Sequence, residues 1–504
     1  MLNTFKHILS KNFNYSSYLI IFILTLMAYI SSNGLLADEK GLTPFQKTEN
    51  SAKTLIRGGT IVTMNPNRDV LYKQDILVVG NRIQAIGDLS KEYDSVDKVI
   101  DANGQIIIPG LIQTHLHLSQ TLFRNLAADK NLEQWLDVIL RLQAALDKDS
   151  NYWSSMLGIA ELFLGGTTAI YDMNATHYVD SAFEAIEKTG MRGFSGKRMT
   201  DILKPGYPEK MVQSTDVAFK ESVDLFQKWD GRAGGRIQYC FCPGSVDECT
   251  EELLKLTSDF SAKYQARVQT HAAESKDVAP IVLKRTGMSE VAYLNSLGLI
   301  NPRTVLAHCV HVSPSDIDLV AKGGAHVAHC PTSNLFLASG IAPTPSMIDK
   351  GINIGMGSDN AADNTNLDTF KELQLAALLQ KGLHANPTIQ PSAQRAFEMA
   401  TLGGAKALGL EEEIGSIETG KKADLAILDF RKPHTWPNES EVNSKDNIYT
   451  RIVYSAMSSD VVLTMVDGQI VMQDRKLLTM DLNEVLEKSN AAIIRLLSIT
   501  QAPL

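Results

Sequence analysis

The sequence lacks the features that define several large classes of protein. Its five cysteines contain no Cys-x-x-Cys pair and form no even framework, so we expect no required disulfide and at least one free thiol. Cys240 and Cys242 are expected to be small core residues. The formal net charge is −9 and no stripe of lysine or arginine is present, so we expect no nucleic-acid partner. A small diffusible substrate fits this composition better than a polyanion.

The sequence also lacks an apolar run of comfortable length for a membrane span. The apolar run at residues 18–30 follows Lys6 and Lys11 and precedes a segment of small residues. This order is typical of a secretory signal peptide, which we place within residues 1–37. An uncleaved N-terminal anchor is the alternative, and it is the only form in which we expect membrane attachment. In both cases we expect an exported protein, either periplasmic or extracellular.

What is present is an ordinary globular composition, long enough for one large domain and a smaller one. The chain has 504 residues, of which 44% are hydrophobic and 21% are charged. Short alternating segments typical of β-strands occur near both ends of the chain. We expect residues 52–109 and 416–475 to form one composite β-sandwich domain, followed by a helical segment at 476–504.

Residues 110–415 alternate strand-like and helix-like segments. The strand candidates are apolar and short, and amphipathic helical patterns lie between them. The strand candidates comprise residues 107–117, 167–172, 192–198, 236–241, 267–271, 304–308, 325–329 and 352–359. Eight β-α repeats predict an α/β fold, a (β/α)8 TIM barrel. Periodicity alone leaves an open doubly wound sheet as the alternative, and the placement of the chemistry favours the barrel.

The first predicted strand ends in the pair His115 and His117, the most informative feature of the chain. Residues two apart on a strand point the same way, so two imidazoles leave one strand end on one face. Two ligands of a single metal ion require this arrangement. His-x-His pairs also occur by chance on protein surfaces, so the other strand ends decide what this pair means.

Histidines and carboxylates also follow the later strands, whose carboxyl ends converge on one mouth in a barrel. Three neutral imidazoles and one carboxylate suit zinc or ferrous iron and leave a position for water. We therefore expect one divalent metal ion, zinc or Fe(II). Its expected ligands are His115, His117, His271 and Asp359.

Other residues at these strand ends are expected to handle protons. A metal ion of this kind lowers the pKa of a bound water to about 7. Glu274 is the expected proton shuttle, His308 would orient the nucleophile or touch the leaving group, and Asp359 could also accept a proton. The two carboxylates also have purely structural alternatives. Glu274 could be a carboxylate at a helix N-terminus, and Asp359 could be a helix N-cap.

These motifs resemble the amidohydrolase superfamily, in the branch of guanine deaminases, adenosine-type and 5′-deoxyadenosine deaminases and s-triazine hydrolases. The resemblance covers roughly residues 52–475 and rests on the segments 109–117, 271–275, 306–310, 329–335, 357–359 and 414–425. It implies a barrel with one divalent metal and hydrolytic loss of ammonia or another leaving group from a heteroaromatic ring. Binuclear members carry a carboxylated lysine on the fourth strand, which is missing here at residues 236–241.

The positions that would read the substrate depart from these relatives. After the fourth strand, adenosine-type deaminases usually have Pro-His-Ser and guanine deaminases Pro-Arg-Phe, whereas this chain has Pro-Gly-Ser with Gly244 in the middle. Adenosine-type enzymes also place a ribose-binding glutamate after a tryptophan. Here Trp135 is present, but the corresponding position is Ala144. The candidate substrate contacts are Gln143, which precedes it, and Arg198.

The sequence therefore predicts an exported, metal-dependent aminohydrolase acting on an amino-substituted purine, pyrimidine or triazine. Its expected partners are this small heterocycle and water, and assembly into a homo-oligomer is an open possibility. Hydrolysis of a chloro- or alkylamino-triazine at the same site is the alternative reaction. An exported metal- or ligand-binding protein without turnover is the alternative of a different class.

Overall fold

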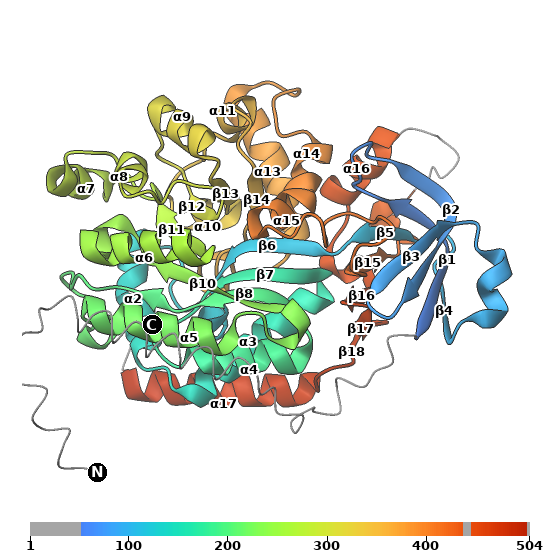
Figure 1. Ribbon diagram of the computed structural model, residues 1–504, viewed down its shortest axis with the longest axis horizontal. Coiled ribbons are helices and arrows are strands. Elements are labelled where there is room, and N and C mark those ends of the chain that lie inside the picture. The colour runs from blue at the N-terminus through green and yellow to red at the C-terminus, as the bar shows by residue number, and fades with distance from the viewer. Residues whose placement is uncertain (1–51, 437–444, 501–504) are drawn as a thin grey trace, which may run out of the picture. The chain divides into compact units, whose positions relative to one another are not determined.

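The computed structural model describes residues 52–436 and 445–500, which contain two sheets and the helices around them (Figure 1). The predicted signal peptide or anchor at residues 1–37 lies outside the described residues. Among the helices of the described ranges, none combines the length and the apolar character needed to cross a membrane.

Eight parallel strands of one sheet follow one another in chain order and form a nearly closed barrel. The strands are β6 (Leu111–Leu116), β7 (Thr167–Met173), β8 (Arg192–Gly196), β10 (Ile237–Pro243), β11 (Arg267–Ala272), β12 (Thr304–His308), β13 (His326–His329) and β14 (Ile354–Met356), and the short β9 (Arg198–Met199) pairs with β10. A parallel bridge between Leu116 and Asp359 joins the last strand region to the first. The predicted TIM barrel is confirmed, since sequential order and closure exclude an open doubly wound sheet.

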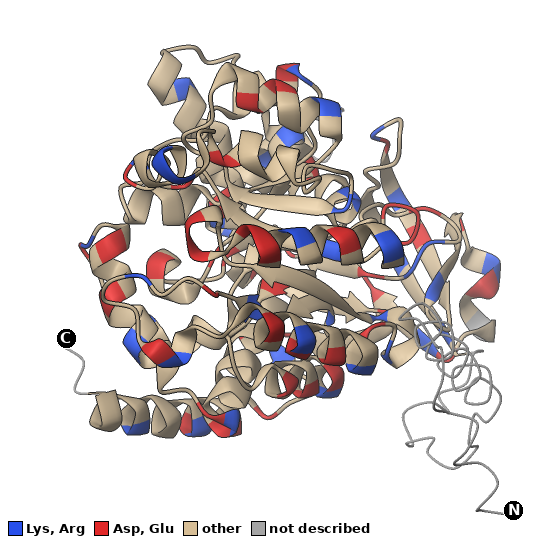
Figure 2. Ribbon diagram, turned by 60° about the vertical axis from the view of Figure 1, so that its left-hand side comes forward, with Lys and Arg blue, Asp and Glu red and all other residues tan. Residues whose placement is uncertain are grey.

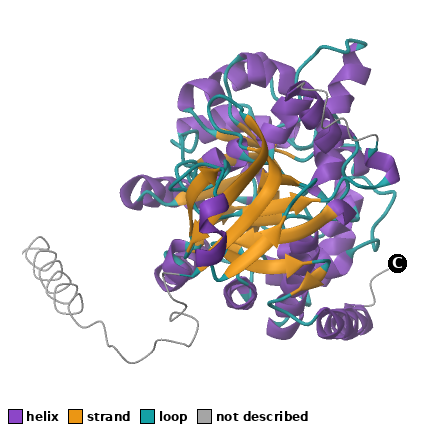
Figure 3. Ribbon diagram, turned by 90° about the vertical axis from the view of Figure 1, so that its right-hand side faces the viewer, coloured by secondary structure: helices purple, strands orange, loops and turns teal. Residues whose placement is uncertain are grey.

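Helices cover the outside of the barrel strands (Figure 3). The α-helices of the described ranges are α2 (Leu132–Ala144), α3 (Lys148–Leu164), α4 (Val179–Thr189), α5 (Thr215–Trp229), α6 (Glu251–Tyr264), α7 (Ala279–Thr286), α8 (Glu290–Ser296), α9 (Pro314–Gly323), α10 (Pro331–Phe336), α11 (Thr344–Asp349), α12 (Ala361–Asn364), α13 (Thr369–His384), α14 (Ala393–Met399), α15 (Leu402–Leu408), α16 (Lys445–Tyr454) and α17 (Leu482–Thr500). Local sequence sets several starts: Asp147 caps α3 through Ser150 N, and Ser313 caps α9 through Asp316 N. α17 packs on α3, where Ser489 Oγ donates to the Trp153 carbonyl oxygen.

Both ends of the chain supply the second sheet, which mixes parallel and antiparallel pairs. Its strands are β1 (Lys53–Val62), β2 (Val70–Val79), β3 (Arg82–Gly87), β4 (Lys98–Asp101), β5 (Ile106–Pro109), β15 (Leu425–Leu428), β16 (Val461–Val466), β17 (Gln469–Gln473) and β18 (Lys476–Leu477). Apolar side chains from β1 through β16 share one core, including Ile56, Ile107 and Leu463. The prediction that both chain ends build a separate β-domain is confirmed, and its strands form one continuous mixed sheet where we expected a sandwich.

One apolar run of sequence serves both sheets, so the prediction of a single strand over residues 107–117 is wrong. β5 pairs with β1 and β15 in the composite sheet, whereas β6 starts the barrel beside β7. Gly110 lies between the two strands. A Cβ atom at this position would lie 2.0 Å from Thr168 Oγ1, so the close approach of β7 requires glycine.

The cysteines and the charged residues follow the expected distribution between core and surface. All five cysteines are free and buried, and Cys240 and Cys242 belong to an apolar cluster inside the barrel, as predicted. On the helices in view in Figure 2, lysines and arginines as well as aspartates and glutamates lie on the surface.

Candidate metal centre and active site

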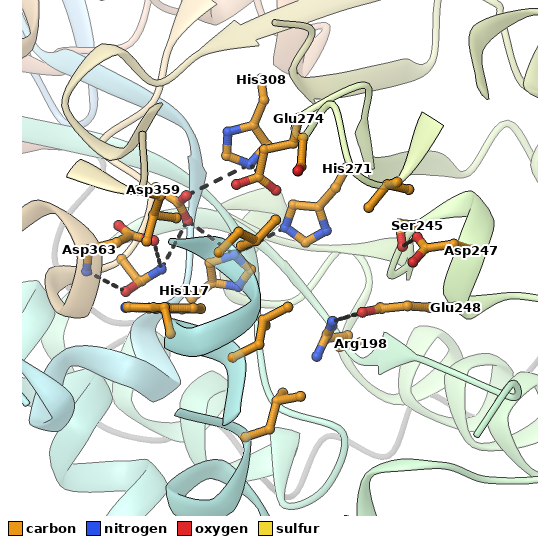
Figure 4. A pocket seen from close by; sticks show the side chains of 18 of the residues that line it. His117, Arg198, Ser245, Asp247, Glu248, His271, Glu274, His308, Asp359 and Asp363 are labelled. Atoms are coloured by element: carbon orange, nitrogen blue, oxygen red, sulfur yellow. Dashed lines mark hydrogen bonds and ion pairs between the residues drawn. The ribbon is translucent and has the colours of Figure 1, made fainter. Parts of the chain in front are cut away.

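A pocket at the carboxyl ends of the barrel strands contains most of the predicted site (Figure 4). The strand-end residues that line it are His117, His271, Glu274, His308 and Asp359. Helix α2 adds an apolar part of the wall with Leu132, Trp135, Leu136 and Leu140. A charged part is formed by Arg198, Lys204, Tyr207, Asp247 and Glu248. His115 lies behind this surface and is fully buried.

Four histidines of the centre are each held through Nδ1 by an acceptor. The contacts join His115 to Gln269 Oε1 (3.0 Å), His117 to the Met173 carbonyl (2.6 Å), His271 to the Gly244 carbonyl (2.7 Å) and His308 to Asn334 Oδ1 (3.0 Å). Because these oxygens accept, a neutral ring carries its proton on Nδ1 and leaves a lone pair on Nε2. Metal-binding histidines are oriented by contacts of this kind.

The Nε2 atoms are directed toward Asp359 and toward one another. His117 Nε2 lies 3.2 Å from Asp359 Oδ1 and 3.4 Å from His271 Nε2. His115 Nε2 lies 3.5 Å from the same carboxylate oxygen and is buried without a hydrogen-bond partner among the described residues. Lone pairs that face a carboxylate repel it unless a cation lies between them. The donor set therefore fits a metal ion.

The donor atoms fall into two compact groups that share His115. One group is His115, His117 and Asp359, and the other is His115, His271 and His308, with all donor atoms of a group within 4.8 Å of one another. All four predicted ligands belong to these groups. The structure adds His308, which the sequence indicated as a catalytic residue, so the division between ligands and catalytic residues stays a prediction.

Burial favours the neutral form of the His115 and His271 imidazoles, as a metal ligand requires. It lowers the pKa of His115 to about 4 and, with the neighbouring histidines, holds the pKa of His271 well below its ordinary value. Burial raises the pKa of Asp359, but its contacts with His115 and His117 outweigh this and leave the pKa well below the ordinary value. The neutral rings of His115 and His271 thus accompany the charged carboxylate of Asp359.

Glu274 lies beside this centre in a position to exchange protons. Its Oε2 is 3.7 Å from His308 Nε2, and the same nitrogen is 3.7 Å from Asp359 Oδ2. Burial raises the pKa of Glu274, and the nearby Asp359 carboxylate raises it further. A carboxyl group with a raised pKa holds a proton more readily than an ordinary carboxylate does, which suits a group that accepts and passes on a proton.

The two predicted substrate contacts differ in position. Arg198, from the short strand β9, lines the pocket. Gln143 is buried in α2 behind Gln120, whose Nε2 lies 3.5 Å from Gln143 Oε1. Gln120, in the short helix Leu118–Phe123 that follows the first two histidines, is the glutamine that lines the pocket. The role of Gln143 stays a prediction, with Gln120 between it and any ligand.

Several residues of the site were missed by the sequence reasoning. Gln269 was within reach, because it precedes His271 by two positions and so shares its face of β11. Asn334 lies in the motif segment 329–335, but no local sequence pattern indicated that its side-chain amide contacts His308. Glu248 gave no signal, because its place depends on the path of the loop after β10.

Comparisons with known proteins agree with this geometry. The family model described as "Amidohydrolase family" matches residues 106–471. A 5′-deoxyadenosine deaminase of Methanosarcina mazei is 35% identical over 442 residues, covering 88% of this chain and 98% of that protein. An adenosine deaminase structure from Xanthomonas campestris with bound zinc has a TM-score of 0.81 at 27% identity, covering 89% of this chain and 99% of that one.

A third similarity is to an enzyme with a different leaving group. The zinc complex of atrazine chlorohydrolase from Arthrobacter aurescens TC1 has a TM-score of 0.81 at 26% identity, covering 87% of this chain and 100% of that one. The family match extends from β5 through the barrel to β17 and includes every proposed metal ligand. The chain belongs to the amidohydrolase family.

Proposed function

We propose that this protein is a metal-dependent hydrolytic deaminase of a purine-like amino heterocycle. It is a hydrolase of the amidohydrolase family that acts on carbon–nitrogen bonds in cyclic amidines. The observation that carries the proposal is the set of buried imidazoles, each held at Nδ1, whose free nitrogens face Asp359 beside Glu274. The 5′-deoxyadenosine deaminase and adenosine deaminase relatives support the choice of an aminopurine-like ring.

Zinc is the metal that we propose for this centre. Imidazole nitrogens and one carboxylate suit it, and two similar structures contain it. His115, His117, His271 and Asp359 would hold the ion, with His308 close enough to join them. When bound, the ion supplies a water molecule made acidic enough to act as a nucleophile near neutral pH.

The surrounding residues of this chain would then move protons and exclude water. Glu274 would take a proton from the water and deliver it to a ring nitrogen, which makes the amino-bearing carbon more electrophilic. His308, held by Asn334, would orient the nucleophile opposite the carbon. The apolar surface of α2, including Trp135 and Leu136, would cover the face of the flat ring.

Release of ammonia from a panel of heterocycles by the metal-loaded protein tests this proposal. The panel contains 5′-deoxyadenosine, adenine, guanine, cytosine and an amino-triazine. We expect ammonia from at least one ring, and we expect Glu274→Gln to keep its metal while turnover falls by about 10²–10⁴-fold. An unchanged rate in this variant would remove Glu274 from the mechanism, and a panel without ammonia release would refute the deaminase.

Dehalogenation is the second candidate, favoured by the similarity to atrazine chlorohydrolase. The same centre would attack a ring carbon that carries chlorine, and chloride would leave in place of ammonia. A chloro-triazine in the panel, read by chloride release, separates the two reactions. Chloride release without any deamination would replace our proposal with this one.

A further inference from the structure

A buried ion pair lies in the charged part of the pocket wall, between Arg198 of β9 and Glu248 of the loop after β10. Arg198 Nη2 donates to Glu248 Oε1 at 2.7 Å and to Oε2 at 2.6 Å. The Tyr207 hydroxyl donates to Oε1 at 2.7 Å. The side chains of Arg198 and Glu248 are only 7% and 5% exposed, so the pair is held rigidly within the wall.

The carboxylate of this pair occupies space that a side chain at position 244 would need. A Cβ atom on Gly244 would lie 2.2 Å from Glu248 Oε2 and 3.4 Å from Arg198 Nε. The Gly244 carbonyl also accepts from His271 Nδ1 at 2.7 Å. One glycine therefore contacts both the metal centre and the ion pair, and His271, Arg198 and Glu248 line the same pocket.

The pair keeps unused hydrogen-bonding capacity. Arg198 Nε is buried without a hydrogen-bond partner among the described residues. Among the same residues, Glu248 Oε2 accepts only from Arg198, whereas Oε1 also accepts from Tyr207. A guanidinium with free donors next to a carboxylate oxygen with free lone pairs matches a ligand edge that has an acceptor beside a donor.

The neighbouring charges indicate that the ligand is neutral at this edge. Lys204 Nζ forms an ion pair with Asp247 Oδ2, and Ser245 Oγ donates to Asp247 Oδ1 at 2.6 Å. Each of the two cations of the pocket wall is thus matched by a carboxylate. A phosphate or carboxylate group on the ligand would find no unmatched positive charge here.

We propose that Arg198 and Glu248 read the edge of the substrate ring and select a neutral amino heterocycle that carries an oxo group beside a ring N–H. The guanidinium donates to the oxo oxygen, and the carboxylate accepts the ring N–H. Gly244 makes this possible because it leaves room for the carboxylate. This inference rests on the proposed deaminase function and names the class of its substrate.

Isoguanine and adenine form a matched pair of test rings, since isoguanine adds an oxo group and a neighbouring N–H to the same aminopurine. We expect the metal-loaded protein to deaminate isoguanine with a kcat/KM at least about tenfold above that for adenine. Glu248→Gln replaces the charged acceptor with an amide of the same shape, and we expect it to remove this preference while metal content is unchanged. Equal rates for the two rings in the unmodified protein would overturn the proposal.

A purely structural role of Glu248 predicts a different result, because both rings would then lose the same factor in Glu248→Gln. Such a parallel loss would also overturn the proposal. The matched control is Asp424→Asn, which changes another buried arginine–carboxylate pair, Arg192–Asp424, outside the pocket. This control is expected to keep the ratio between the rings.

Two further measurements separate this inference from the proposed function. Calorimetric binding of both rings to the metal-loaded Glu274→Gln protein gives the preference without turnover, so the pair is judged even if no ammonia is released. If isoguanine binds no more tightly than adenine, the role of the Arg198–Glu248 pair is refuted, whereas the proposed deaminase function is not. Gly244→Ala should displace the carboxylate and lower the preference as Glu248→Gln does, and a preference kept in both variants would refute the assignment.

Discussion

Two buried arginines only six positions apart show how differently the two ends of the barrel strands are used. Arg192 begins β8, where the barrel meets the composite sheet, and its guanidinium is bound by Asp424 at 2.7 and 3.0 Å and by Asp467 at 3.0 Å. Arg198 lies beyond the other end of that strand and shares the pocket wall with Glu248, its Nε without a hydrogen-bond partner among the described residues.

The difference separates stability from function within one fold. The seam is the junction of the barrel with the composite sheet at Arg192, Asp424 and Asp467. There the buried arginine is paired with carboxylates and hydrogen-bonded to them. At the mouth of the barrel, where the pocket lies, nitrogens such as His115 Nε2 are buried without hydrogen bonds. Buried groups without partners cost free energy, so they persist where a ligand completes them. Variants at the mouth should therefore change metal content or catalysis, and variants at the seam should change stability.

The largest effect is expected at the mouth, from His115→Ala. This residue belongs to both compact donor groups, so its loss breaks both. We expect metal content to fall well below one ion per chain and turnover to be lost, as measured by elemental analysis and ammonia release. The matched control is His329→Ala, which removes another buried strand-end histidine outside both groups and should keep the metal. Full metal content in His115→Ala would refute the site.

The next largest effect is expected at the seam, from Asp424→Asn. Removing one charge of a buried pair costs about 3–5 kcal/mol in the free energy of unfolding. Denaturant titration measures this loss, and metal content should be unchanged while the protein is folded. The exposed pair Arg57–Asp101 offers a control, since Asp101→Asn should change stability by no more than about 1 kcal/mol. Similar losses of unfolding free energy in Asp424→Asn and Asp101→Asn would show that the buried pair at the seam contributes no more to stability than an exposed pair.

The smallest effect is expected from Gln269→Ala. Gln269 acts on the metal centre only through its contact with His115. Gln269 Oε1 holds His115 Nδ1, and its Nε2 donates to the Thr114 carbonyl at 2.9 Å. Loss of such a supporting contact weakens metal binding about 10–100-fold. Competition with a chelator measures this affinity, and Gln238→Ala on the neighbouring strand β10 should leave it unchanged. An unaltered affinity in Gln269→Ala would show that the ring orientation does not depend on this amide.

The sequence predicted the barrel well because most residues of the strands are buried and the strands are short segments separated by amphipathic helical patterns. It did not predict the break between β5 and β6, since the run stays apolar on both sides of Gly110. Glycine is needed at this break because Thr168, far away in the sequence, approaches it closely, which no local pattern reveals.

The metal centre could be predicted because its residues follow directly on the strands, where topology brings them together. Residues that depend on side-chain direction were harder to find. Gln143 was chosen by its spacing from Trp135, yet Gln120 lies between it and the pocket. Glu248 is placed by a loop, and the glycine that admits it was recorded in the sequence only as a departure from relatives.

The continuity of β5 with β6 has a consequence for how the protein is made. β5 pairs with β15, which arrives more than three hundred residues later, and the same segment continues into the strand that carries His115 and His117. A nascent chain that has passed Asp359 already contains every proposed ligand but still lacks Leu425–Leu428, the strand that borders β5. The order of synthesis thus makes the pairing of β5 with β15, in the middle of the composite sheet, complete only after every proposed metal ligand has been made.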